Sequence, residues 1–275
     1  MTKNYILWTG IKANSKVSDK YKYGDYSWME YSRKTWEFYA KKIGAEFIAY
    51  EKPFDDTVDL LKTKVNWLRW LELSKIIPDD YDQVLSTDAS IMVRWDCPNL
   101  FDIANFEFTA VRGNENLRWT YESVMGYKDM FPDVQFRPND YFASGFIIFS
   151  KKHKEFWKNV KEFYYENAFN IIRHEDETVK RGRDQPILNY LVRKHNIPIK
   201  YFPIAFGVNH LYRREILRGN WQLQQQEPTN NEHGIPFFIK YFYVYIFSGF
   251  SDRGETRTNM MKQTWEIIKH NYGST

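Results

Sequence analysis

A carboxylate and a hydroxyl two residues apart, Asp88 and Ser90, stand between the apolar residues 84–85 and 91–93. Buried strands of parallel sheets are nearly continuous in apolar residues, so a carboxylate in this place needs a charge partner or a ligand to compensate its desolvation. Alternate residues of a strand point to the same side, and ligands of α/β sheets collect at the carboxyl ends of strands. The pair therefore predicts a site that holds a cation or a ribose.

An amphipathic helix is expected directly before this strand. Apolar residues recur there at intervals of three to five positions, and Pro78 ends the run; they are Leu61, Val65, Leu68, Leu71 and Ile76. The helix feeds the strand that carries Asp88, and the two elements together deliver the carboxylate to the edge of a sheet.

The order of several motifs resembles the donor-sugar site of GT-A glycosyltransferases, and of the glycogenin-like retaining family in particular. The matching segments are Thr63-Lys64, Asp88-Ala89-Ser90, Leu100-Phe101-Asp102, residues 141–148, residues 184–189 and residues 246–249. The resemblance covers roughly residues 5–262 by motif order rather than by close identity. It implies an α/β fold of GT-A type, with a Rossmann-like mixed central sheet flanked by helices.

The resemblance also implies an activity and a set of site residues. The expected reaction moves a sugar from a nucleotide-diphosphate donor, a UDP-sugar, to a hydroxyl of a glycan or a protein, with retention. Asp184 and Lys64 are the expected catalytic residues, with Asp184 beside the reacting sugar and Lys64 against the donor. The residues expected to bind the donor are Trp8, Thr9, Lys64, Asp88, Ser90, Gly145, Gln185, Gly249 and Arg253.

The expected metal site departs from the family pattern. Ser90 replaces the second acid of the Asp-x-Asp motif, and Ile246 stands where the family has a histidine. Mn²⁺ and Mg²⁺ require several oxygen or nitrogen ligands, and one carboxylate with one hydroxyl is a poor set. Asp88 and Ser90 are therefore expected to hold a divalent cation weakly or not at all.

Two other arrangements would compensate for the missing ligands. Protein cations that follow residue 249 could neutralise the diphosphate in place of the metal; the candidates are Arg253, Arg257 and Lys262. Alternatively, His210 or Asp252 could complete the ligand set.

Composition indicates one large α/β domain over residues 1–275, with residues 250–275 as a C-terminal helical extension. The single cysteine, Cys97, excludes an intrachain disulfide and favours a reducing compartment. No leader, membrane-spanning run or glycosylation sequon is evident, so a cytoplasmic location is expected. The net charge of +4 does not by itself imply a polyanionic partner.

Two alternatives remain open. A phage-type enzyme that glycosylates hydroxymethylated DNA bases would use the basic segments 151–161 and 180–183 for phosphate contacts. A non-catalytic protein that binds sugar nucleotides or glycans would explain the lost acid and histidine. Zinc spacings, a nucleophile elbow and a phosphate-binding glycine loop are all missing from the sequence.

Further elements follow from the remaining pattern. Strands are expected at residues 5–9, 45–50, 106–112, 199–203 and 237–248, and helices at 27–43, 151–167 and 258–270. Gly44 is expected to end the first helix. Residues 113–140 lack a clear period and are expected to form a long loop or lid.

Overall fold

The computed structural model describes residues 2–12, 26–55, 64–113, 117–207, 237–248 and 255–273. Within them a six-stranded sheet has the order β2-β1-β3-β6-β5-β7. Its strands are β1 (Asn4–Thr9), β2 (Glu46–Tyr50), β3 (Gln83–Asp88), β5 (Phe108–Arg112), β6 (Phe142–Ser150) and β7 (Ile199–Tyr201). β6 runs antiparallel to both of its neighbours, and the other pairs are parallel. The start of β6 therefore lies at the same edge as the carboxyl ends of the parallel strands.

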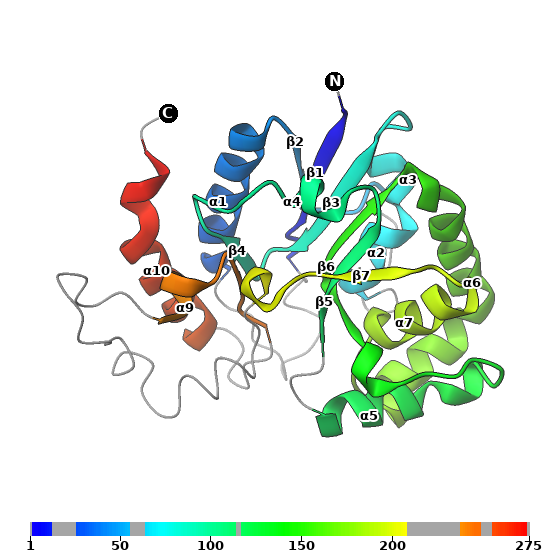
Figure 1. Cartoon of the computed structure of the whole chain (residues 1–275). Helices are drawn as coiled ribbons and strands as arrows, with labels where there is room; N and C mark the ends of the chain where they lie inside the picture. The colour runs from blue at the N-terminus through cyan, green and yellow to red at the C-terminus, as the bar shows by residue number, and fades with distance from the viewer. Residues whose placement is uncertain are drawn as a thin grey trace.

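Helices cover both faces of this sheet (Figure 1). On one side lie α1 (Trp28–Ile43), α4 (Leu100–Ala104), α9 (Phe237–Tyr241) and α10 (Glu255–Ile268). On the other lie α2 (Val65–Leu71), α3 (Leu73–Ile76), α5 (Leu117–Gly126), α6 (Lys154–Arg173) and α7 (Asp184–Lys194). Alternate residues of β1 serve the two cores: Ile6 and Trp8 pack into the first, Tyr5 and Leu7 into the second. The expected α/β fold with a mixed central sheet flanked by helices is therefore confirmed.

Most predicted elements form where the sequence pattern places them. α1 ends at Gly44, which has φ of 69° and takes up the left-handed conformation that glycine adopts without strain. The helix expected before Asp88 is divided into α2 and α3 at Glu72.

Two segments differ from the prediction. Residues 113–140 hold α5 and two short 3₁₀ turns, Lys128–Met130 and Pro138–Asp140, rather than a loop. The buried face of α5 is made by Thr120, Ser123 and Val124, so its hydrophobic period is weak. Residues 237–248, expected as one strand, form α9 and then β8 (Val244–Ile246). A continuous aromatic run shows neither helical nor strand periodicity, which explains the second error.

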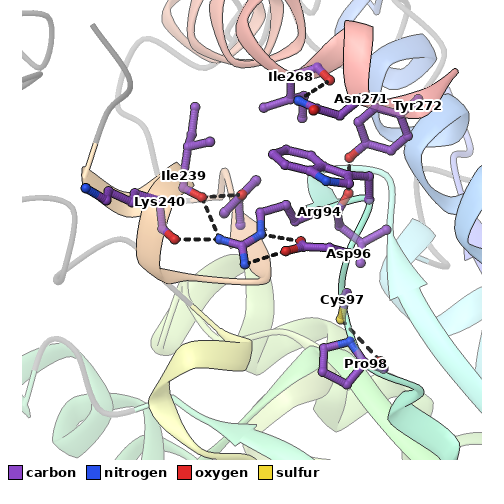
Figure 2. A network of polar contacts seen from close by, with 12 residues as sticks. Arg94, Asp96, Cys97, Pro98, Ile239, Lys240, Ile268, Asn271 and Tyr272 are labelled. Carbon is purple, nitrogen blue, oxygen red and sulfur yellow. Dashed lines mark hydrogen bonds and ion pairs between the residues drawn. The ribbon is translucent and has the colours of Figure 1, made fainter. Parts of the chain in front are cut away.

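A small second sheet and one arginine hold the C-terminal part of the chain to this framework. β8 pairs antiparallel with β4 (Ile91–Val93). Directly after β4, Arg94 donates from Nη1 to the carbonyls of Ile239, at 2.9 Å, and Lys240, at 2.6 Å, as Figure 2 shows. The Tyr272 hydroxyl donates to the Val93 carbonyl. These bonds join α9 and the end of the chain to β4, the element that follows Asp88.

None of the helices in the described ranges combines the length and the apolar character that crossing a bilayer requires. The division into one domain with a C-terminal extension stays a prediction.

Candidate functional site

The site is built at the edge where the carboxyl ends of β1 and β3 meet. Thr9 and Asp88, the last residues of the two strands, are register partners, and the backbone N–H of Ala89 donates to the Thr9 carbonyl at 2.9 Å. Gly145 of β6 faces the same carboxylate: a Cβ there would lie 2.5 Å from Asp88 Oδ2. Only glycine leaves Asp88 its position, because real Cβ atoms do not approach a heavy atom so closely.

A buried arginine of α2 holds the carboxylates of this site. The Arg69 side chain is 1% exposed, and its Nη1 donates to Asp88 Oδ1. Its Nη2 lies 3.6 Å from Asp184 Oδ2 and donates to the Ser144 carbonyl at 3.2 Å. One guanidinium therefore links the end of β3, the start of α7 and β6. A cation buried to this degree is stable only with such partners.

Asp184 is the first residue of α7 and is itself buried, with its side chain 2% exposed. Trp70 Nε1 donates to its Oδ2 at 2.9 Å. Burial raises the pKa of Asp184, and the nearby Arg69 opposes that rise. The structure thus buries a carboxylate between an indole N–H and a guanidinium.

Side-chain amides fix α7 to the start of β6. Gln185 Oε1 accepts from the backbone N–H of Ser144 at 3.1 Å. Asn189 accepts from the N–H of Phe142 at 3.0 Å and donates to its carbonyl at 2.9 Å. These bonds set the distance between Asp184 and Gly145, so the motif around Asp184 has a positioning role that its sequence does not reveal.

The turn before Asp184 is strained. Gly182 has φ of 82°, and a Cβ there would lie 2.4 Å from Pro186 Cγ. Arg183 has φ of 49°, an uncommon value for a residue with a side chain. Its guanidinium donates to Asn66 Oδ1 at 2.8 Å. The turn therefore presents a cation at the rim and directs Asp184 inward.

A second buried carboxylate lies one helical turn away. Trp67, three residues before Trp70 on α2, donates from Nε1 to Glu175 Oε1 at 2.8 Å. Burial raises the pKa of Glu175 to about 7, and Asp184 adds to that rise. The other oxygen, Oε2, is buried with no hydrogen-bond partner in the described part of the chain. Trp67 and Trp70, which lie on one face of α2, therefore each donate a hydrogen bond to a buried acid, Glu175 and Asp184 respectively.

The structure brings four of the predicted residues together, namely Asp88, Gly145, Asp184 and Gln185. Lys64, the residue that precedes α2, forms an ion pair with Asp176 at 2.9 Å and is 21% exposed. Gly249 and Arg253 lie outside the described residues, as do the alternative ligands His210 and Asp252.

The other predicted donor contacts are more enclosed. Thr9 is 9% exposed, and its buried Oγ1 lacks a hydrogen-bond partner within the residues described. The Trp8 ring is 1% exposed and donates from Nε1 to Ser32 at 2.9 Å, so it packs in the core. Ser90 is 7% exposed, and its carbonyl accepts from the N–H of Phe247 at 2.8 Å.

The residues at this edge fit a divalent cation poorly. Asp88 is already paired with Arg69, and Ile246 is buried opposite Ile91 in the small sheet and offers no donor atom. Across the described ranges, no three His, Cys, Asp or Glu side chains are grouped so that they could bind a metal. A hard cation such as Mg²⁺ prefers several oxygen ligands, and at this edge the carboxylate of Asp88 already binds the guanidinium of Arg69.

Arg69 is the site residue that the sequence reasoning missed. The same desolvation argument that singled out Asp88 could have found it, because Arg69 is a charge inside the apolar run Trp67-Leu68-Arg69-Trp70-Leu71. A buried cation and a buried carboxylate in one sequence are expected to pair, because each compensates the desolvation of the other.

The fold defines a structural class: this chain has a mixed α/β fold of the GT-A type, which it shares with a glycosyltransferase of solved structure. The solved structures similar to it include a glycosyltransferase involved in the glycosylation of the major capsid of PBCV-1, with a TM-score of 0.52 and 14% identity over 95% of this chain and 99% of that chain.

Two more distant structures are mouse xyloside xylosyltransferase 1 and the bifunctional glycosyltransferase WbbM. The first has a TM-score of 0.46 and 9% identity, covering 89% of this chain and 97% of that one. The second has a TM-score of 0.45 and 13% identity, covering 100% of this chain and 52% of that one. No protein-family profile and no curated protein sequence matches the chain.

Proposed function

We propose that this protein is a glycosyltransferase that moves a sugar from a nucleotide-diphosphate donor, a UDP-sugar, to a hydroxyl acceptor, with retention at the anomeric carbon. The observation that carries the proposal is the arrangement Asp88–Arg69–Asp184 at the carboxyl edge of the sheet. Ligands of open α/β sheets bind at this edge. The fold shared with a glycosyltransferase supports the same reading.

Donor binding would use the groups that the edge leaves available. Asp88 is 33% exposed despite its bond to Arg69, so one oxygen can accept from a ribose or sugar hydroxyl. Thr9 Oγ1 is buried and would accept or donate a bond to the donor only after a local rearrangement, so the carboxylate of Asp88 is the main group that the edge offers. Gly145 has no side chain, which leaves room for the Asp88 carboxylate in the position from which it would meet the donor.

Transfer needs charge stabilisation at two places. Negative charge develops on the departing diphosphate. Arg183, an exposed cation that donates to the neutral amide of Asn66, can neutralise it, and Lys64 can do so by exchanging its partner Asp176 for the diphosphate. Positive charge develops on the anomeric carbon, and Asp184, if ionised through its contacts with Arg69 and Trp70, would stabilise it. The acceptor oxygen forms the new bond to that carbon on the same face from which the diphosphate departs, as the bond from the carbon to the diphosphate oxygen breaks, and the hydroxyl proton passes to the departing diphosphate.

A divalent cation has no role in this proposal, because the ligand chemistry at Asp88 does not suit one. Neutralisation by protein cations is the alternative that the sequence analysis raised. Of its three candidates, Arg257 is on α10 and lies over the Trp28 ring, 4.8 Å from the ring centroid. Lys64 and Arg183 extend this set.

The DNA alternative loses support from the ion pairs of the basic segments. Lys151 pairs with Asp82 at 2.8 Å, and Lys154 pairs with Asp79 at 2.6 Å. Arg181 pairs with Glu122. Cations that are neutralised within the protein contribute less to phosphate binding. We therefore favour a glycan or protein hydroxyl as the acceptor. The cytoplasmic location and the kinship to the glycogenin-like family stay predictions.

The test is hydrolysis and binding of a panel of nucleotide sugars, with EDTA and then with Mn²⁺. Wild type is compared with Asp88→Asn, and with Asp102→Asn as a control that removes an exposed carboxylate of α4. Release of UDP that survives EDTA and is lost in Asp88→Asn alone is the expected result. Binding without turnover would favour the non-catalytic alternative, and no binding across the panel would overturn the donor site.

A further inference from the structure

A hollow with a volume of about 540 Å³ opens away from the residues of the candidate donor site. It lies between the 3₁₀ turns that follow α5 and the C-terminal half of α7. The side chains that line it are Lys128, Gln135, Phe136, Arg137, Asp140 and Arg193. Three of these are cations and one is a carboxylate, so the hollow is electropositive.

The cations of this hollow outnumber its one carboxylate, Asp140, so that within the described part of the protein they are neutralised only in part. None of Lys128, Arg137 and Arg193 forms an ion pair with a carboxylate of the described residues, whereas many other basic side chains do. Arg193 donates to the carbonyl of Asn189 at 2.6 Å and to the carbonyl of Asp140. Its guanidinium also lies 4.1 Å from the centre of the Phe136 ring. The two carbonyls fix this side chain in place, and the Asp140 carboxylate of the same hollow offsets part of its charge without forming an ion pair with it.

The hollow is connected to the donor site through α7. Asn189, whose carbonyl accepts from Arg193, also binds both backbone groups of Phe142 at the start of β6. Arg193 follows Asp184 by nine positions on one helix, which corresponds to about 13 Å at 1.5 Å per residue. A ligand longer than one sugar could therefore reach from the hollow to the reacting carbon.

The mixture of side chains points to a sugar that carries an acid. Cations bind a carboxylate or a phosphate, the Gln135 amide can serve ring hydroxyls, and Phe136 offers a half-buried aromatic ring. A hollow for an apolar molecule would lack the cations. We propose that this hollow is the acceptor subsite for an acidic sugar, one bearing a carboxylate or a phosphate. The acceptor role of this hollow rests on the proposed glycosyltransferase function. The binding of an acidic sugar there does not depend on that function.

The experiment measures binding of tetragalacturonate, mannose 6-phosphate and a neutral tetrasaccharide by calorimetry. The variant is Lys128→Gln with Arg137→Gln, two side chains at the surface whose loss should not affect folding. The matched control, Lys52→Gln with Lys158→Gln, removes the same charge from the β2 end of the sheet and from α6. UDP binding is followed in every protein as the readout of the donor site.

We expect wild type and control to bind an acidic sugar and not the neutral one. The variant should bind roughly a hundredfold more weakly, since it loses two charge-assisted bonds and each costs about a factor of ten, with UDP binding unchanged. The two acidic probes distinguish a carboxylate from a phosphate ligand.

Equal binding by the variant, or equal binding of the neutral sugar, overturns the inference while leaving the donor site intact. Charge-dependent capture of a single-stranded oligodeoxynucleotide, with no binding of acidic sugar, also overturns it. Acidic-sugar binding without any UDP binding would support the subsite and overturn the proposed transferase.

Discussion

The guanidinium of Arg69 donates to the carboxylate of Asp88 from a position that is 1% exposed. This bond explains why a charged residue can end β3 and why another can lie inside the apolar run of α2. The same arginine reaches Asp184, so a single side chain organises both acids of the candidate site. Stability and donor binding are therefore coupled at Arg69.

Replacing Arg69 with methionine should lower the free energy of unfolding by about 3 kcal/mol, because it leaves Asp184 buried without its cation. Asp88→Asn should cost less than half as much, since Asp88 is 33% exposed and Arg69 keeps its second carboxylate. Urea unfolding at neutral pH measures both. Equal losses in the two variants would mean that Arg69 does not serve Asp184.

A methyl group at Gly145 should abolish donor binding. The Cβ of Gly145→Ala would lie 2.5 Å from Asp88 Oδ2, so the carboxylate must rotate away from its place. Gly44→Ala is the matched control: Gly44 has φ of 69° and nothing within 4 Å, so that change should cost roughly 1 kcal/mol of stability without touching the site. Titration with UDP-sugars should show loss of binding in the first variant only. Unchanged affinity in Gly145→Ala would remove Asp88 from the donor site.

Lys64 should contribute to the turnover of a UDP-sugar and contribute little to the stability of the protein. Its pair with Asp176 is partly exposed, with side chains 21% and 47% accessible, so breaking it should cost less than about 1 kcal/mol. Lys64→Gln should reduce turnover of a UDP-sugar roughly 10²-fold if the lysine stabilises the leaving diphosphate. Asp176→Asn removes the other half of the pair and should leave turnover within a fewfold of wild type. Similar losses in both variants would mean that only the ion pair itself is needed.

Sequence patterns predicted the fold well where one face of an element is apolar and the other polar. α1 and its end at Gly44 are examples, as is the strand that ends at Asp88. The prediction failed where that contrast is weak. α5 buries Thr120 and Ser123, whose small polar side chains do not mark a hydrophobic face. Residues 237–248 are mostly aromatic or aliphatic, with Lys240 and Ser248 as the exceptions, so they do not set a period.

The candidate site was predictable as a set of motifs but not as a set of contacts. Asp88 and Asp184 are far apart in the sequence, and their common partner is a third segment that spacing alone cannot join to them. The buried Glu175 was equally hidden, because an acidic residue beside Asp176 and Glu177 looks like part of a solvated turn. Burial of single charges depends on tertiary packing, which a local pattern does not contain.

Glu175 should make the stability of the protein depend on pH in an unusual direction. Burial raises its pKa from 4.5 to about 7; the hydrogen bond from Trp67 and the charges of Arg183 and Lys64 oppose the rise, and the charge of Asp184 adds to it. Below pH 4.5 the acid is protonated in both the folded and the unfolded chain, so it costs nothing. Between pH 4.5 and about 7 only the unfolded chain releases the proton, and stability falls as pH rises.

Glu175→Gln keeps the acceptor for Trp67 and removes this titration. The variant should match wild type near pH 4 and exceed it above pH 8 by up to about 3 kcal/mol, from 1.36 kcal/mol for each unit of pKa difference. Glu177→Gln, an exposed acid of the same turn, is the control and should show no such divergence. Asp184 interacts with Glu175, so the difference between wild type and Glu175→Gln reports the titration of Glu175 together with its effect on Asp184. Urea unfolding from pH 4 to 9 measures the effect, and parallel curves for the two variants would mean that Glu175 is ionised at little cost in the folded protein.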